Sequence, residues 1–420
     1  MDSFDELYRQ TLENAVRRKV EKHLKDPEAN ADYDKYQLDC LLNPEKEREA
    51  RTISECLCVN PDAKAKGLKC FFEAIRKDEN GKVFLSEEKW DGCTACLEGD
   101  RKKDLAERKD LLPIFEMLMH KEAPVYALIA PAFISQFSEE ITPGMLRSSF
   151  KHIGFAGMIE VALFADILTL KEALEYDRSI KSEEDFVLAS CCCPMWIAMI
   201  RKSYKDMVPH IPPSVSPMVA SGRSIKRLHP EARTVFIGPC IAKKAEAREP
   251  DVADAIDYVL TFQEVRDIFA LTGVDPATEP EDLRAHSSLA GRIYARAGGV
   301  SMAVRSTVER LHPNRNIPFK AEKADGVAAC RALLERVRAG EVTSNFIEGM
   351  GCAGGCVGGP KALIPRDEGT EHVSHYALSA THHTPVDNPY VMDLLHRLGI
   401  DSIDALLEDT EIFTRHFDAP

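Results

Sequence analysis

The chain of 420 residues contains 13 cysteines, and their spacing is the first chemical signal in the sequence. Six of them lie within the first hundred residues. The other seven form three groups: Cys191-Cys192-Cys193, Cys240, and Cys330 with Cys352 and Cys356. Disulfide-rich proteins are usually short and secreted, and an odd number of cysteines fits a disulfide framework poorly. The cysteines therefore predict ligation of a soft metal.

Four of these thiols form the best candidate set of ligands: Cys193, Cys240, Cys352 and Cys356. Four thiolates suit a [4Fe–4S] cluster or a structural zinc ion. Zinc ribbons usually supply two local pairs of ligands, whereas these cysteines come from three separate segments. The glycines between Cys352 and Cys356 let the backbone approach a bulky cofactor closely. A single cysteine can also serve as a small buried hydrophobic residue, which is our interpretation of Cys330 on its Ala/Leu-rich helix.

Short apolar runs alternate with helical patterns around these cysteines. Strands are predicted at 125–130, 186–189, 234–237, 258–261 and 344–347, and helices at 142–153, 157–177, from 195 and at 263–271. This alternation favours an α/β fold with mainly parallel sheets flanked by helices. Each of the three cysteine groups has a member just after a predicted strand, and such sheets bind ligands beyond the carboxyl ends of their strands. We therefore expect the three groups to meet at one site.

The first 110 residues differ from the rest, because they are rich in Lys, Glu and Asp and poor in strand signals. The candidate metal ligands here are Cys56, Cys58, Cys70, Cys93 and Cys96, with Cys40 as a sixth. Six cysteines suffice for one four-thiolate site and not for two. A zinc ion remains the alternative to an iron–sulfur cluster, since C-x-x-C pairs suit both. Residues 1–110 are thus expected to form a small, mostly helical domain.

The composition excludes several classes of partner. The chain has 54 Lys+Arg against 68 Asp+Glu, so its formal net charge is −14, which argues against binding to nucleic acid or an anionic membrane. Residues 1–25 lack the apolar core of a signal peptide, and no apolar run is long enough to span a bilayer. We expect a soluble, cytoplasmic protein whose thiols stay reduced. His372, His375, His382 and His383 are assigned to a solvated loop rather than to a metal.

Three motifs around the cysteines resemble those of the [FeFe]-hydrogenases. Residues 190–196 read S-C-C-C-P-M-W, similar to the family's T-S-C-C-P-x-W. Residues 238–246 read G-P-C-I-A-K-K-A-E, similar to M-P-C-x-x-K-x-x-E. Residues 348–359 read E-G-M-G-C-A-G-G-C-V-G-G, similar to E-x-M-A-C-x-x-G-C-x-x-G-G. Order and spacing agree over all three, and a weaker likeness extends from about residue 125 to the C-terminus.

The resemblance implies that Cys193, Cys240, Cys352 and Cys356 hold the [4Fe–4S] part of an H-cluster. Cys356 would also bridge to a di-iron subsite that carries CO, cyanide and an aza-dithiolate. Other family positions fall on Lys243, which would hydrogen-bond a cyanide ligand, on Met350, which would pack near the di-iron unit, and on Cys192, which would relay protons. The family also carries accessory clusters, which implies one [4Fe–4S] cluster within residues 1–110.

The proton path of the family maps onto Glu172 and Glu175, which are three residues apart and so share a helix face. On its own such a pair is typical of a solvated helix face, but the resemblance places both on the relay glutamates. It also places Glu246 on the glutamate near the second cysteine motif. The serine that joins the relay glutamates is matched by Pro212, which has no hydroxyl. Protons would then pass through water, Ser214 or another route.

Other departures are Gly238 for a methionine, Met218 for a glutamine and Tyr294 for a phenylalanine. Changes around a metal site tune its potential and rate, and this pattern resembles divergent, sensory-like branches. We predict an [FeFe]-hydrogenase-like enzyme that interconverts H2 with protons and electrons slowly. One alternative is an H2-sensing regulatory hydrogenase that signals through a partner. Another is a hydrogenase-like iron–sulfur assembly factor, a class without the di-iron site and the relay thiol.

The resemblance also sets the expected architecture and partners. Residues 123–420 would form a two-lobed domain similar to the iron hydrogenase large subunit, with a small-subunit-like C-terminal segment. The expected partners are H2 and protons, together with a ferredoxin-like electron carrier or a signalling partner. A homodimer is kept as a candidate assembly, and neither nucleic acid nor a membrane is expected.

Overall fold

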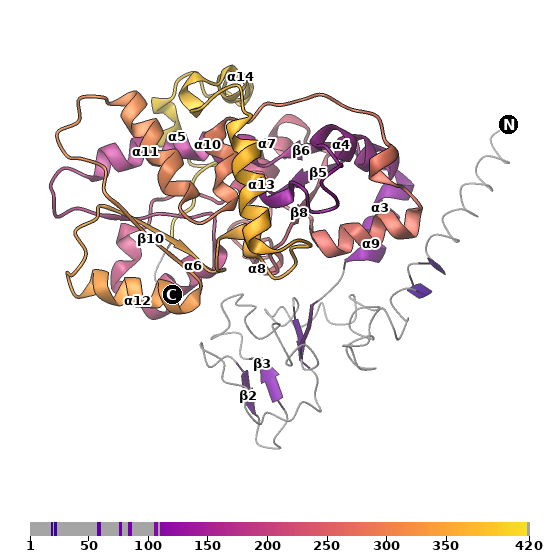
Figure 1. Ribbon diagram of the computed structural model, residues 1–420, viewed down its shortest axis with the longest axis horizontal. Coiled ribbons are helices and arrows are strands. Elements are labelled where there is room, and N and C mark those ends of the chain that lie inside the picture. Colours follow the sequence, from indigo (N-terminus) through magenta and orange to yellow (C-terminus); the bar gives the residue numbers. More distant parts are fainter. Residues whose placement is uncertain are drawn as a thin grey trace.

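The computed structural model describes residues 110–417, residues 18–19 and 21–22, and four short strands before residue 110 (Figure 1). These strands are β1 (Leu57–Val59), β2 (Ile75–Lys77), β3 (Val83–Leu85) and β4 (Leu105–Glu107). Strand β1 pairs with β4 and β2 with β3, both antiparallel. The backbone of Cys58 lies in β1, whereas Cys40, Cys56, Cys70, Cys93 and Cys96 lie outside the described residues. The accessory metal site and the mostly helical character of residues 1–110 therefore stay predictions.

A four-stranded parallel sheet forms the first half of the body, in the order β6-β5-β8-β9. Its strands are β5 (Val125–Ile129), β6 (Gly157–Glu160), β8 (Arg233–Gly238) and β9 (Tyr258–Thr261). Side chains alternate between two cores, with Leu128 and Phe236 on one face and Ala127 and Val235 on the other. Helices α5 (Ala162–Ser179), α7 (Pro217–Leu228) and α14 (Pro389–Arg397) cover the first face. Helices α3 (Leu111–His120), α4 (Pro143–His152) and α9 (Phe262–Thr272) cover the second.

A three-stranded parallel sheet forms the second half, in the order β10-β11-β7. Its strands are β7 (Val187–Leu188), β10 (Ala321–Asp325) and β11 (Phe346–Met350). Phe346 packs with α5 and α11 (Gly299–Leu311), while Ile347 packs with α6 (Pro194–Ser203) and α12 (Val327–Arg338). Figure 1 shows β10 and the strands β5, β6 and β8 on opposite sides of this body.

Helix α5 belongs to the cores of both sheets. Every residue from 164 to 176 is buried, including Asp166, Lys171, Glu172 and Glu175. A helix that is buried on all sides leaves its charged side chains no access to bulk water, so they need partners inside the protein. This helix is therefore the element on which buried charge is concentrated.

The predicted fold class, mainly parallel sheets flanked by helices, is confirmed, with two local differences. Residues 157–160 were expected to be helical and instead form β6, in which Met158 enters the core and Glu160 pairs with Arg147 at 2.6 Å. Strand β10 was not expected, because its sequence A-E-K-A-D is polar; it lies at the edge of its sheet. No helix within the described residues is long and apolar enough to cross a membrane.

Candidate functional site

Three parallel strands each end just before a cysteine group. Strand β7 leads to Cys191-Cys192-Cys193, β8 leads to Cys240, and β11 leads to Cys352 and Cys356. Strands β7 and β11 share one sheet and β8 belongs to the other, so the cysteines come from the carboxyl ends of both sheets. Helix α6 and the short helix α8 (Ala242–Glu246), which come after the first two groups, contact each other (Figure 1). Each cysteine group thus follows the carboxyl end of a strand, which agrees with the expectation from the sequence.

The thiols of these groups act on one another electrostatically. Desolvation raises the pKa of Cys240 to about 11 and that of Cys356 to about 12, and the neighbouring Cys193 adds to both rises. The pKa of Cys192 lies well above its ordinary value, first through desolvation and then through Cys356 and Cys193. Several thiolates in one place would repel one another, so their ionised forms need a compensating cation.

The donor set fits an iron–sulfur cluster better than a single zinc ion. A tetrahedral zinc ion with Zn–S bonds near 2.3 Å holds its thiolates about 3.8 Å apart. Among the residues that the structure describes, no three cysteine sulfurs lie within 4.8 Å of one another. Wider spacing suits the larger [4Fe–4S] core. The backbone N–H of Gly351 also donates to the Cys193 Sγ at 3.3 Å, the kind of contact that tunes a cluster's potential.

The glycines of the third motif let the polypeptide close around this site. Gly355 has a φ of +88°, and a Cβ on it would lie 2.6 Å from the backbone nitrogen of Ala297. A Cβ on Gly349 would lie 2.1 Å from the ring of Trp196, whose indole N–H donates to the Ala189 carbonyl at 2.8 Å. Any larger residue at either position would push the third motif away from its neighbours.

Helix α8 brings a buried cation to the cysteines. The Lys243 Nζ donates to the Glu246 Oε2 at 2.5 Å, and both side chains are buried. Burial lowers the pKa of Lys243, but Glu246, Cys240 and Cys192 together raise it above its ordinary value. Lys243 is therefore a persistent positive charge beside Cys192 and Cys240. Met350, the last residue of β11, is buried next to this region.

The two predicted relay glutamates are buried and differ in their partners. Burial and the nearby Glu175 raise the pKa of Glu172 to about 8, and the Glu172 Oε2 has no hydrogen-bond partner within the described chain. Glu175 instead forms an ion pair with Lys171 and accepts a hydrogen bond from the Ser214 hydroxyl at 3.2 Å. Burial raises the pKa of Glu175, and Lys171 and Ser214 oppose that rise. The interpretation of this pair as a solvated helix face is thus excluded.

Sequence reasoning missed Lys171 and retained Ser214 only as one alternative. The Ser214 hydroxyl donates to Glu175, while the Pro212 carbonyl accepts from the Cys191 thiol at 3.4 Å. A signal for Lys171 was present, because the residues before it, A-L-F-A-D-I-L-T-L (162–170), are apolar around almost the whole helix, which predicts a buried helix. A lysine on such a helix needs a partner, and Glu175, four residues further on, lies on the same face of the helix.

Two further buried carboxylates hold the surroundings of the site in place. Glu348, which opens the third motif, accepts the backbone N–H groups of Gly298 and Ser301 at 2.6 and 2.8 Å, at the start of α11. Asp166 on α5 accepts from the backbone N–H groups of Ser288 and Gly291 at 2.7 and 2.8 Å. Each joins segments that are remote in the sequence, and sequence reasoning gave neither a structural role.

The hydroxyl of Tyr294 lies 2.9 Å from that of Thr169 on α5. Tyr294 is buried, and its pKa lies well above the ordinary value because of burial and because of the nearby Glu172. The tyrosine found at the family's phenylalanine position thus places a polar group beside Glu172. Cys330 on α12 donates its thiol to the Met350 carbonyl at 3.2 Å and is fully buried, as expected for a packing residue.

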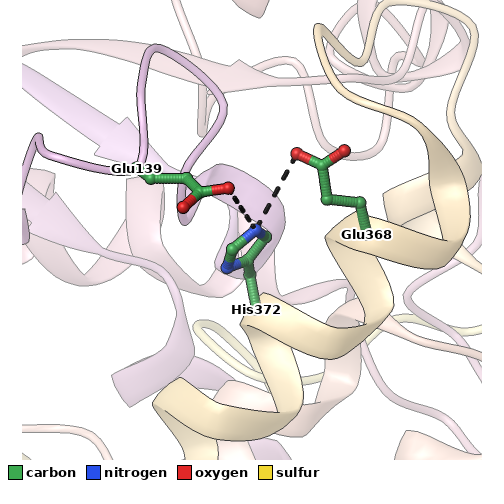
Figure 2. Close-up of side chains that lie close together, drawn as sticks. All are labelled: Glu139, Glu368 and His372. Carbon is green, nitrogen blue, oxygen red and sulfur yellow. Dashed lines mark ion pairs between the residues drawn. The ribbon is translucent and has the colours of Figure 1, made fainter.

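One group of potential metal ligands lies away from the cysteines. Figure 2 shows His372 between Glu139 and Glu368, with Nε2–Oε1 distances of 3.6 and 3.8 Å. His372 and His375 belong to helix α13 (Arg366–Leu378) and not to a loop as expected. The side chain of Glu139 is 72% exposed, so its contact with His372 is a surface ion pair. This group joins the segment around residue 139 to α13.

Comparison with known proteins identifies relatives of this chain. Residues 123–360 match the family model described as "Iron only hydrogenase large subunit, C-terminal domain". The chain is 27% identical over 268 residues to the periplasmic [Fe] hydrogenase large subunit of Nitratidesulfovibrio vulgaris, which covers 54% of this chain and 64% of that protein. It is 23% identical over 308 residues to cytosolic iron–sulfur assembly component 3 of Mus musculus, covering 60% of this chain and 64% of that protein. The chain thus spans less than two thirds of either relative.

A solved structure shares the fold. A variant of the [FeFe]-hydrogenase from Chlamydomonas reinhardtii superposes with a TM-score of 0.58 at 21% identity, over 74% of this chain and 98% of that chain.

Proposed function

Because the chain belongs to the family of the iron-only hydrogenase large subunit, we propose that it binds an H-cluster and interconverts H2 with protons and electrons, slowly and by a modified proton path. Cys193, Cys240, Cys352 and Cys356 would hold the [4Fe–4S] part, and Cys356 would also reach the di-iron subsite with its CO, cyanide and aza-dithiolate. When bound, that subsite supplies a metal that polarises H2 and an amine that takes up a proton. One accessory [4Fe–4S] cluster, held among Cys56, Cys58, Cys70, Cys93 and Cys96, would exchange electrons with a ferredoxin-like carrier.

The observation that carries this proposal is the position of Cys192. Its thiol is surplus to the four cluster ligands, yet it interacts electrostatically with Cys356, Cys193 and Glu172. A thiol near both a cluster ligand and a buried carboxyl would be suited to pass a proton from one to the other. The assembly factors, the class without a di-iron site, lack this relay thiol, so its presence favours the proposal.

Lys243 and Glu246 have a separate task in the proposal. The Lys243 ammonium is a compact donor beside Cys192 and Cys240, suited to an anionic ligand such as cyanide. Its ion pair with Glu246 fixes the direction of the side chain and keeps it charged. Met350 would close the pocket from the end of β11 and exclude water.

The second candidate is an iron–sulfur assembly factor, which the likeness to cytosolic iron–sulfur assembly component 3 favours. A third, the H2-sensing regulatory hydrogenase, shares the same cluster and is favoured by the departures at Gly238, Met218 and Tyr294. The assembly factor differs from both hydrogenase hypotheses in having no di-iron site. The retained thiol of Cys192 favours the hydrogenase hypotheses.

Infrared spectroscopy after loading tests the proposal. The full chain, reconstituted with [4Fe–4S] clusters and then with a synthetic di-iron complex, should show CO and cyanide bands and exchange H2 with solvent deuterons. Cys240→Ala should lose the bands together with the cluster, whereas Cys330→Ala, a matched change at a thiol outside the ligand set, should keep them. A chain that carries the [4Fe–4S] cluster but never shows the bands contradicts the proposal and supports the assembly factor.

A further inference from the structure

Lys171 lies at the centre of the buried charge on α5, and the proposed proton relay assigns it no part. It is 1% exposed and forms an ion pair with Glu175, one helical turn further on. Its Nζ also donates to the Pro213 carbonyl at 2.8 Å and to the Ser214 hydroxyl at 3.2 Å. An ammonium has three N–H donors, so all three are used. The side chain is held from α5 on one side and from the segment before α7 on the other.

Glu175 is held as firmly as Lys171. One carboxylate oxygen accepts from the Lys171 ammonium, and the other accepts from the Ser214 hydroxyl at 3.2 Å. A group whose two oxygens both accept hydrogen bonds is placed as an ionised carboxylate. Glu172 is the opposite case, because its Oε2 has no partner within the described chain. The two neighbouring acids are therefore expected in different protonation states.

This difference affects any proton that moves along α5. A proton that leaves Glu172 for Glu175 arrives on a carboxylate oxygen that already accepts a hydrogen bond, and it weakens that oxygen's bond to Lys171 or Ser214. Its arrival would neutralise Glu175 and break the direct ion pair that compensates the buried Lys171 ammonium, which is costly in a low-dielectric interior. Arg178 on the next turn lowers the pKa of Glu175, as Lys171 does. Glu348 and Tyr294 interact electrostatically with Glu172. The hydrogen bonds to the Glu175 oxygens come from Lys171 and Ser214, so these other groups act only at longer range.

We propose that Lys171 is a positioning residue that slows the proton path, because its ion pair locks Glu175 in the carboxylate form between α5 and Ser214. The effect on turnover rests on the proposed function. The locked state of Glu175 is independent of that function, because it depends only on residues of the protein itself.

The first test reads the charge state directly and needs no cofactor. Infrared difference spectra of the full chain in H2O and D2O report the carbonyl band of protonated carboxyl groups at neutral pH. The wild-type chain should lose a band in Glu172→Gln and lose none in Glu175→Gln. Lys171→Met should gain a band, and the double variant Lys171→Met/Glu175→Gln should lack it. A wild-type band that disappears in Glu175→Gln, or no gain in Lys171→Met, overturns the proposal.

The double variant also guards against misfolding, because replacing both partners of a buried pair leaves no unpaired charge. Its thermal unfolding should resemble that of the wild type. Lys171→Arg keeps the positive charge and should show no additional carboxyl band. Lys226→Met removes a lysine from a surface pair with Asp257 and should leave the carboxyl bands unchanged.

The second test uses the loaded holoprotein and measures H2/D2O exchange. Lys171→Met should exchange faster than the wild type by roughly tenfold, which is less than the full contribution of a positioned acid or base. Lys171→Arg and Lys226→Met should exchange at the wild-type rate. If the wild type exchanges H2 with D2O and Lys171→Met exchanges at the same rate, the proposal that Lys171 slows the proton path is overturned. Absence of exchange in every variant, with the infrared carboxyl bands as expected, contradicts the proposed function and leaves the locked Glu175 established.

Discussion

Glu172 and Glu175 lie three residues apart on the same buried helix, yet only Glu175 has a partner for each of its oxygens. The lysine and serine direct their hydrogen bonds to Glu175 and not to the Glu172 Oε2, so at Glu172 the charge of Lys171 only partly offsets burial and the neighbouring Glu175. Two identical side chains on one helix thus have different electrostatic environments. The difference follows from where their partners come from, since Ser214 reaches one acid and not the other.

The first prediction concerns the pH dependence of stability. Burial and Glu175 raise the pKa of Glu172 from its ordinary value of 4.5 to about 8 in the folded chain. The folded state therefore holds a proton that the unfolded state releases, so this group's contribution is fully present below pH 4.5 and is lost as the pH rises through 8. In the wild type this group should lower the free energy of unfolding by about 4 kcal/mol between pH 4.5 and 8, and Glu172→Gln should abolish that pH dependence. Urea unfolding at pH 5, 7 and 9 measures it.

The control for that measurement is Glu309→Gln, on an exposed position of α11. This variant should follow the wild type at all three pH values. Equal pH profiles for Glu172→Gln and the wild type would contradict the buried, protonated state of Glu172.

The second prediction concerns Glu348, whose carboxylate accepts from Gly298 and Ser301 at the start of α11. Glu348→Ala leaves these donors buried and unpaired, which should lower the free energy of unfolding by about 2–3 kcal/mol. Because Glu348 lies in β11, the loss should also loosen the segment that carries Cys352 and Cys356. Hydrogen exchange of the amides in residues 348–359 should speed up, and Glu309→Ala should leave them unchanged.

The third prediction concerns cluster loading. Desolvation raises the pKa of Cys240 to about 11 and of Cys356 to about 12, so both are protonated before the metal binds. Ligation must displace these protons, and the occupancy reached during reconstitution with iron and sulfide should rise from pH 7 to pH 9. Cys330→Ala should give the same profile as the wild type, since the Cys330 thiol is hydrogen-bonded within the core. Loading independent of pH would show that the thiols ionise without the metal.

The position of the cysteine groups just after strands was predictable, because short apolar runs precede them in the sequence and parallel sheets carry loops at the carboxyl ends of their strands. The partners of Lys171 were not, because its acceptors Pro213 and Ser214 stand 42 and 43 residues further along the chain. Local patterns can require that a buried lysine be paired, but they cannot say which remote segment supplies the partner. Strand β10 was missed for a related reason, because its polar sequence carries no strand pattern and it becomes a strand by pairing with the remote β11.

The fourth prediction separates backbone strain from packing at the third motif. Gly355 and Gly340 have φ values of +88° and +72°, so alanine at either position strains the backbone. A Cβ at Gly340 meets nothing within 4 Å, whereas one at Gly355 would lie 2.6 Å from the backbone nitrogen of Ala297. Gly340→Ala should lower the free energy of unfolding by about 1 kcal/mol, and Gly355→Ala by more than about 2 kcal/mol. Gly355→Ala should also reduce iron bound per chain, because Cys356 is the next residue, while Gly340→Ala should bind the wild-type amount. Equal losses of stability at the two glycines would mean that Ala297 moves aside, and would remove the packing argument for this motif.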